Sequence, residues 1–266
     1  MQYRFDTYAA AVDALDAALA FERQPVGVKI FRSSDEFASF DAPEPRVAAY
    51  YCALTKLAAR GYRFKLAPRH FKCGASAIAL GLERVEDPAA RADSYVACGL
   101  YDDRDVAARA LGGSPHLAPG VVGVAVAPLA SFSADEAPDA VVMVVSAYTA
   151  MRLVQGYSFH RPGGASTRLR GMHGICGEST AAPLPADELT MSLLCSGTRF
   201  IAKWRDDEVA ISLPATQFAE LVDGVLRTLA PCETDAKKAV LEAAAGVRLE
   251  ECGVEIGYGA GYFYDV

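Results

Sequence analysis

Apolar and polar positions alternate along the chain with two periods, one typical of helices and one typical of strands. In residues 6–21 apolar side chains recur at spacings of three and four, which places them on one face of a predicted helix: Tyr8, Val12, Leu15 and Leu19. Pro25 interrupts this pattern, and the string VGVKIF at residues 26–31 predicts a short strand. The opening helix is therefore expected to pack on a sheet.

The same reading extends to the rest of the chain. The apolar runs at 121–127 and 140–145 predict buried central strands. Shorter strands are predicted at 62–66, 189–194 and 209–213, and helices at 46–60, 102–111, 147–157 and after Pro214. This mixture predicts an α/β or α+β fold, in which a single domain holds a mixed central sheet flanked by amphipathic helices.

The chain divides into a long regular part and a short terminal part. Residues 1–231 are expected to form the single globular domain, and residues 232–266 a C-terminal helix with a Gly/Tyr-rich docking tail. The tail sequence EIGYGAGYFYDV suits a contact that makes a homo-oligomer, and a frayed terminus is the alternative interpretation.

Charge narrows the range of partners. Lys and Arg number 26 against 33 Asp and Glu, which gives a net charge of −7. Because no basic run could follow a phosphate backbone, nucleic acid is not an expected partner. The amino end lacks a basic leader, and the longest apolar run, residues 140–145, is far shorter than a membrane span. We therefore expect a cytoplasmic protein without a membrane contact.

Seven cysteines are the most distinctive chemical feature. They form no CxxC pair, and an odd number in a chain without an export signal predicts reduced thiols. Cys73, Cys176 and Cys195 are each followed within two residues by Gly or Ser, so backbone N–H groups can turn toward the sulfur. Such donors favour a thiolate, which serves as a nucleophile or as an iron ligand. Independent buried cysteines are the alternative.

Several short strings occur in an order that resembles a known family. They are PVGVKIF at 25–31, YCALTKLAARGY at 51–62, CGASAIALGL at 73–82, AMRLVQGY at 150–157, GICGES at 174–179 and LCSGTR at 194–199. Together they resemble the uncharacterised family known as domain of unknown function 169. The resemblance extends from the first predicted helix to the last amphipathic one.

The resemblance implies that four cysteines belong to the family pattern: Cys52, Cys73, Cys176 and Cys195. Four thiolates match the ligand count of an all-cysteine iron–sulfur cluster or of a structural zinc site. Zinc ligands usually come in close pairs, whereas these come from separate segments, so a [4Fe–4S] cluster with redox or Lewis-acid chemistry is the leading hypothesis. One departure is the turn after Cys73, Gly74-Ala75-Ser76, where the family has a Cys-Pro-Gly-Gly type of turn.

Three basic residues inside the matched strings are candidates for cofactor or substrate binding. They are Lys56, Arg152 and Arg199. Cationic side chains beside a thiolate site suit a small anionic molecule, and a redox partner is the other expected partner. A solvated surface charge is the alternative for each of them.

Two other function classes remain open. Cys176 is a candidate catalytic nucleophile, with His173 three residues before it as the base and His160 in the same loop. A non-enzymatic binder is the second alternative, with a pocket for a flat cofactor lined by aromatic residues: Tyr50, Tyr51, Phe71, Tyr157 and Phe159. The sequence contains neither a GxxxxGK[ST] phosphate loop nor an HExxH zinc motif.

Overall fold

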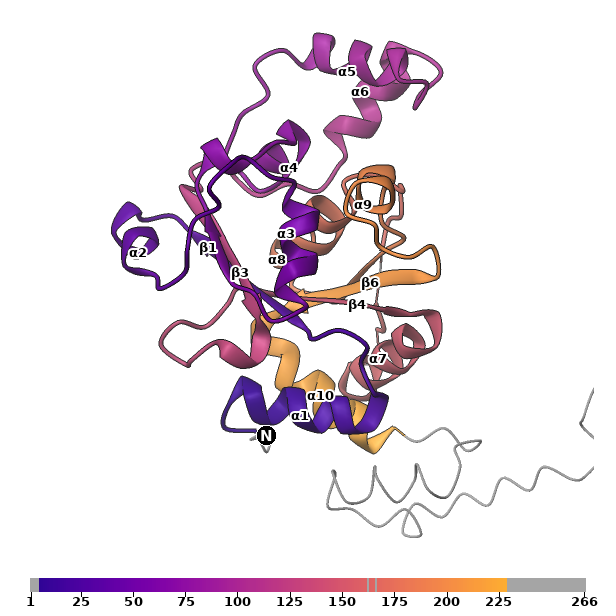
Figure 1. Ribbon diagram of the computed structural model, residues 1–266. Helices are drawn as coiled ribbons and strands as arrows, with labels where there is room; N and C mark the ends of the chain where they lie inside the picture. Colours follow the sequence, from indigo (N-terminus) through magenta and orange to yellow (C-terminus); the bar gives the residue numbers. More distant parts are fainter. Residues whose placement is uncertain (1–4, 162, 166, 229–266) are drawn as a thin grey trace, which may run out of the picture.

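The computed structural model describes residues 5–161, 163–165 and 167–228. A single sheet lies in the middle of the described part, with helices on both of its faces (Figure 1). This arrangement confirms the predicted fold class and the expectation of a sheet flanked by helices. The predicted C-terminal helix and docking tail at 232–266 lie outside the described residues.

Within the described residues, the sheet has six strands in the order β2-β3-β1-β4-β6-β5, and each neighbouring pair is antiparallel. The strands are β1 Val26–Phe31, β2 Phe64–Leu66, β3 Gly123–Pro128, β4 Ala140–Ser146, β5 Thr190–Ser192 and β6 Glu208–Pro214. The sequence analysis expected a mixed sheet, whereas the described strands pair only in the antiparallel direction. The apolar pattern could not predict this, because strand direction depends on how the connections pass through space.

Ten α-helices are assigned in the described residues. They are α1 Tyr8–Leu19, α2 Ser34–Ser39, α3 Tyr51–Ala58, α4 Gly74–Ala79, α5 Pro88–Ala97, α6 Arg104–Gly112, α7 Ala147–His160, α8 Pro183–Ala186, α9 Ser196–Phe200 and α10 Phe218–Arg227. Four shorter or wider helical segments accompany them: the 3-10 helices η1 Pro68–His70, η2 Leu129–Ser131 and η4 Ala215–Gln217, and the π-helix η3 Gly174–Ala181.

Strand β4 shows how one apolar run serves both faces of the sheet. Val141, Met143 and Val145 pack in the core formed with α1, α7 and α10. The intervening residues Ala140 and Val142 pack in a second core on the opposite face. Because side chains alternate across a strand, a run buried on both faces has to be continuously apolar. The predicted central strands are therefore confirmed.

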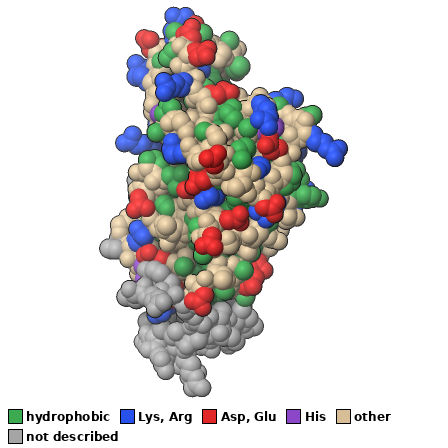
Figure 2. Space-filling model, turned by 90° about the vertical axis from the view of Figure 1, so that its left-hand side faces the viewer, with side chains coloured by type: hydrophobic (Ala, Val, Ile, Leu, Met, Phe, Trp, Pro, Cys, Tyr) green, Lys and Arg blue, Asp and Glu red, His purple; other side chains and the backbone are tan. Residues whose placement is uncertain are grey.

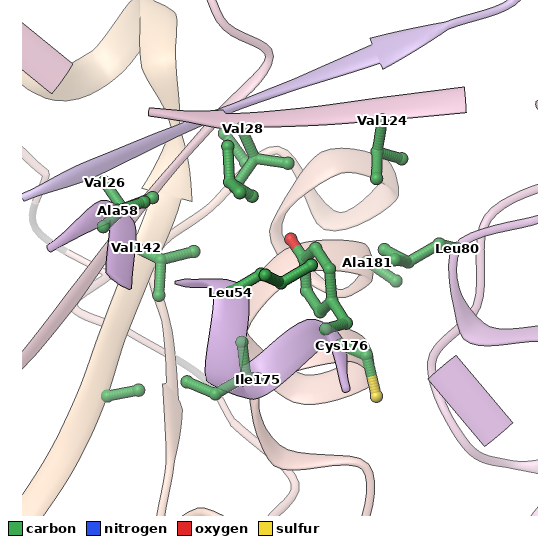
Figure 3. Packing of buried hydrophobic residues seen from close by; sticks show 14 of the residues in the cluster. Val26, Val28, Leu54, Ala58, Leu80, Val124, Val142, Ile175, Cys176 and Ala181 are labelled. Carbon is green, nitrogen blue, oxygen red and sulfur yellow. The ribbon is translucent and has the colours of Figure 1, made fainter. Parts of the chain in front are cut away.

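The second core contains the elements that carry the cysteines. Here α3, α4 and η3 pack against β1, β3 and β4. Figure 3 shows Cys176 at the margin of this core, with its sulfur directed away from Val28 and Val124 of the sheet. The Cys176 backbone is therefore held by the packed core, while its thiol points away from the apolar side chains of the sheet.

Helices α5 and α6 form a hairpin that projects beyond the sheet, above α4 in Figure 1. Each is anchored by one fully buried residue, Ala92 in α5 and Ala107 in α6. Asp87 and Asp103 cap their first turns by accepting hydrogen bonds from backbone N–H groups. The sequence analysis missed α5, because its polar composition hides the weak apolar face that contacts the body.

Surface charges of both signs are interspersed on the face drawn in Figure 2. In the described part of the chain, none of the helices combines the length and the apolar character that a membrane crossing requires.

Candidate functional site

The four cysteines of the family pattern line one cavity of about 190 Å³. Cys52, Cys73 and Cys195 are partly buried and Cys176 is buried. The wall is completed by uncharged residues: Tyr50, Ala75, Ser76, Tyr95, Leu100, Gly171, Met172, His173, Ile175, Ser196, Gly197, Thr198 and Ile201. No Lys, Arg, Asp or Glu of the described residues contributes to this wall.

Each cysteine lies at the beginning of a different helix. Cys52 is the second residue of α3, and Cys176 is the third residue of the π-helix η3. Cys73 and Cys195 occupy the N-cap positions of α4 and α9. Residues that are 19 to 143 positions apart along the chain therefore converge only because these four segments pack together on the same face of the sheet.

Two of these segments approach so closely that only glycine fits between them. A Cβ atom on Gly174 would lie 2.7 Å from Leu194 Cα and 2.9 Å from the backbone nitrogen of Cys195. Both neighbours are backbone atoms, which cannot rotate away as a side chain can. Gly174 thus sets the distance between the segment that carries Cys176 and the segment that carries Cys195.

Hydroxyl groups accompany the sulfur atoms. Thr198 Oγ1 lies 3.1 Å from Cys195 Sγ and is also a hydrogen-bond neighbour of the Cys52 thiol. The Ser76 hydroxyl hydrogen-bonds the Cys176 thiol. Such donors stabilise a thiolate or a sulfur that is bound to a metal. The sequence analysis missed both hydroxyls, although each follows a cysteine by three residues.

Burial nevertheless favours the protonated form of two of these thiols, those of Cys52 and Cys176. It raises the pKa of Cys52 to about 12, with the nearby Cys195 and Cys73 thiols adding to the shift. Burial likewise raises the pKa of Cys176, and the Ser76 hydrogen bond opposes that shift only in part. The nearby Cys195, Cys73 and Cys52 thiols add to the upward shift of the Cys176 pKa.

His173 lines the same cavity and is hydrogen-bonded to a tyrosine. Its Nε2 atom lies 2.9 Å from the hydroxyl of Tyr95, which the α5–α6 hairpin contributes. Its backbone adopts the left-handed conformation with φ of 52°, which is costly for a residue with a side chain. Burial, followed by the charges of Arg91 and Arg170, lowers the pKa of His173 to about 4. The imidazole is therefore neutral at physiological pH.

The nucleophile hypothesis requires a different electrostatic setting. A reactive cysteine has a lowered pKa and a base within hydrogen-bond reach, whereas burial raises the pKa of Cys176. His160 hydrogen-bonds Asp223 Oδ2 at 2.8 Å, on the face of the sheet that carries α7 and α10. Catalysis by Cys176 and His173 thus stays a prediction that the raised pKa of the Cys176 thiol does not favour.

The neutral state of His173 makes the fold sensitive to acid. The unfolded chain binds a proton at His173 near pH 6.5, while the folded chain resists protonation until about pH 4. We expect the metal-free protein to lose about 3 kcal/mol of stability as the pH falls through this window. Urea denaturation at pH 4 to 7 would measure the loss. His173→Asn should flatten the profile, His116→Asn should not, and equal profiles for all three proteins would contradict the expectation.

The three basic candidates bind backbone carbonyl groups instead of facing the cavity. Lys56 Nζ donates to the carbonyls of Ala202 and Lys203. Arg199 donates to the carbonyls of Leu193, Arg205 and Glu208. Arg152 is buried between α7 and α10, where it donates to Gln155, Val225 and Thr228. Their predicted role in binding a cofactor or anion remains a prediction.

The aromatic candidates divide among several locations. Of the five residues predicted to line a pocket, Tyr50 is on the cavity wall. Tyr51 is fully buried and stacks on Phe71 with ring centroids 6.1 Å apart. Tyr157 belongs to the core on the opposite face of the sheet, and Phe159 is exposed. Tyr95 and Met172, which the sequence analysis missed, also line the wall.

The cavity is not a preformed site for a single ion. Within residues 5–161, 163–165 and 167–228, no three side chains of His, Cys, Asp or Glu are grouped so that they could hold one metal ion. The four cysteines line the wall, but among the described residues no three of them are grouped closely enough for that. Ligation by the four cysteines therefore stays a prediction at this stage. Cys98 is exposed and outside the cavity, whereas Cys232 and Cys252 lie outside the described residues.

Comparison with known proteins places the chain in a family without a characterised function. The model of the DUF169 family, described as "Uncharacterised ArCR", matches residues 14–224. The uncharacterized protein MJ0308 of Methanocaldococcus jannaschii is 27% identical over 154 residues, which make up 58% of this chain and 65% of that protein. This chain thus spans slightly less than two thirds of that relative. No solved structure matches this chain. Because the family model covers most of the chain, the resemblance is confirmed, and the protein belongs to the DUF169 family.

Proposed function

We propose that this protein binds a [4Fe–4S] cluster in the cysteine cavity and uses it for electron transfer. One observation carries the proposal: Cys52, Cys73, Cys176 and Cys195 come from four separate segments and line the same cavity. Cysteines that served only as small apolar residues would be expected in the close-packed core rather than together on the wall of one cavity.

The donor set suits iron and sulfide better than other metals. Thiolates select soft or borderline ions, whereas Ca²⁺ and Mg²⁺ require oxygen ligands that this wall does not offer as carboxylates. A single zinc ion needs its ligands close around one point. A cluster has a metal atom at each of four corners, so its thiolate ligands lie farther apart. The four cysteines that line one cavity wall match the ligand count of such a cluster.

The surroundings of the sulfurs support the same proposal. Thr198 and Ser76 place hydroxyl groups beside Cys195 and Cys176, and hydrogen bonds to sulfur tune the reduction potentials of iron–sulfur clusters. Four thiolates would occupy one coordination position on each iron. Full protein ligation leaves no iron open to a substrate, which favours electron transfer to a redox partner over Lewis-acid chemistry on a small anionic molecule.

Anaerobic purification followed by iron and acid-labile sulfide analysis tests this function. We expect about four irons and four sulfides per chain, with the broad visible absorbance of a cluster. A clear negative result would be protein that contains neither element after purification and takes up neither during reconstitution with iron and sulfide. In that case the cavity would serve another ligand.

Trp204 supplies an independent readout of the same loading. It is the only tryptophan of the chain, and its indole N–H donates to the carbonyl oxygen of Cys52 at 3.2 Å. A strongly absorbing cluster bound at Cys52 should quench the Trp204 fluorescence. We expect the emission to rise several-fold when a chelator removes the iron, and to stay unchanged when the same chelator is added to metal-free protein. Equal emission with and without bound iron would contradict this placement.

A further inference from the structure

A buried lysine on the helix that carries Cys52 contacts the segment that follows α9. Lys56 follows Cys52 by one helical turn on α3 and is 9% exposed. Its ammonium donates to the carbonyl of Ala202 at 3.1 Å and to that of Lys203, in the segment that follows α9. The Lys56 side chain therefore connects the helix of Cys52 to the segment that carries Cys195.

Two cationic side chains lie beside the Trp204 ring, and only one of them is paired with a carboxylate. Lys56 Nζ and the Arg23 guanidinium each lie 5.2 Å from the centroid of the Trp204 ring. Arg23 is paired with the buried carboxylate of Glu208. In the described part of the chain, by contrast, Lys56 has no carboxylate within ion-pair distance and contacts carbonyl oxygens and the indole ring. Burial and the charges of Arg23, Arg60 and Arg205 lower the pKa of Lys56.

A buried cation without an anionic partner is costly unless a negative charge is supplied nearby. A cluster bound by four thiolates carries a net negative charge, and one-electron reduction makes that charge larger. We infer that Lys56 compensates the charge of the cluster from the helix that carries Cys52 and thereby raises its reduction potential. The inference rests on the proposed function. It makes Lys56 a positioning and tuning residue rather than a ligand.

The test is a redox titration of the cluster-loaded protein, monitored by EPR spectroscopy. Three variants are compared with the wild-type protein. Lys56→Gln removes the charge and keeps a donor for the carbonyl groups, whereas Lys56→Arg keeps the charge. Lys65→Gln is the matched control. Lys65 also donates to backbone carbonyls, those of Phe37, Ala38 and Phe40, and lies over the Phe37 ring, but it is on β2 and outside the cavity wall.

At the midpoint potential of the wild-type protein, the ratio of reduced to oxidised cluster should fall by about tenfold in Lys56→Gln, a shift of about 59 mV for a one-electron couple. Lys56→Arg and Lys65→Gln should stay close to wild type. Loss of the cluster from Lys56→Gln alone would also support a requirement for the charge. Unchanged potential in Lys56→Gln, or cluster loss from both Lys56 variants, would overturn the tuning role. Wild-type protein without iron would instead refute the proposed function.

Discussion

Replacing any one of the four cavity cysteines with alanine is expected to remove most of the iron and sulfide from the protein. The substitutions are Cys52→Ala, Cys73→Ala, Cys176→Ala and Cys195→Ala. The physical reason is that each thiolate comes from a different helix start, so no neighbouring cysteine of the same segment can replace it. Iron and sulfide analysis of anaerobically purified variants measures the effect directly.

Cys98→Ala is the matched control for this series. Cys98 is exposed at the end of α5 and does not line the cavity, so its removal should leave the iron and sulfide content at the wild-type level. Cys176→Ala deserves particular comparison with Cys176→Ser, because a serine oxygen can still approach the metal at a similar position. Full iron content in Cys176→Ala and Cys195→Ala together would refute ligation by this set.

Substituting Gly174 with alanine should damage both the fold and the site. The new methyl carbon would meet Leu194 Cα at 2.7 Å and the Cys195 backbone nitrogen at 2.9 Å, so the segment before α9 has to move outward. Overpacking of this kind typically costs about 1–3 kcal/mol. We expect the melting temperature of the metal-free protein to fall by about 2–10 °C, and the loaded protein to lose iron faster because Cys195 is displaced relative to Cys176.

Gly112→Ala tests whether this effect is specific to the close approach. A Cβ atom on Gly112, near the end of α6, would have open space around it, and alanine favours a helix over glycine. Thermal denaturation and the rate of iron release to a chelator should match wild type or show a slight gain in stability. A Gly174→Ala protein that retains both the melting temperature and the iron of wild type would show that the two segments can separate without consequence.

The apolar pattern predicted the layered architecture because burial on both faces of a sheet leaves a strong trace in sequence. Residues 140–145 are continuously apolar because they fill two cores, and β4 was found at that position. Helices with weak apolar faces left little trace. Helix α9 has five residues and a single buried one, Thr198, so its sequence shows no periodic apolar face.

Some residues of the candidate site could be predicted from local sequence, and others depend on the tertiary structure. Short strings around Cys52, Cys73, Cys176 and Cys195 identified the cysteines, since the small residues beside three of them are a local feature. The role of Lys56 could not be predicted from its string, because the direction of a long side chain depends on which carbonyl groups lie opposite it. Tyr95 was missed because it reaches the cavity from a hairpin that is remote from the matched strings.

The sequence by itself determined the family, the fold class, the buried central strands and the four cysteines, because each of these leaves a signature within a few neighbouring residues. Only the tertiary structure decided the antiparallel strand order and the cavity that the four cysteines share. It also decided the hydrogen bond between His173 and Tyr95, and the contacts that Lys56, Arg152 and Arg199 make with backbone carbonyls away from that cavity. These features depend on contacts between residues far apart in the chain. Local periodicity carries no information about such contacts until the segments are packed on one sheet.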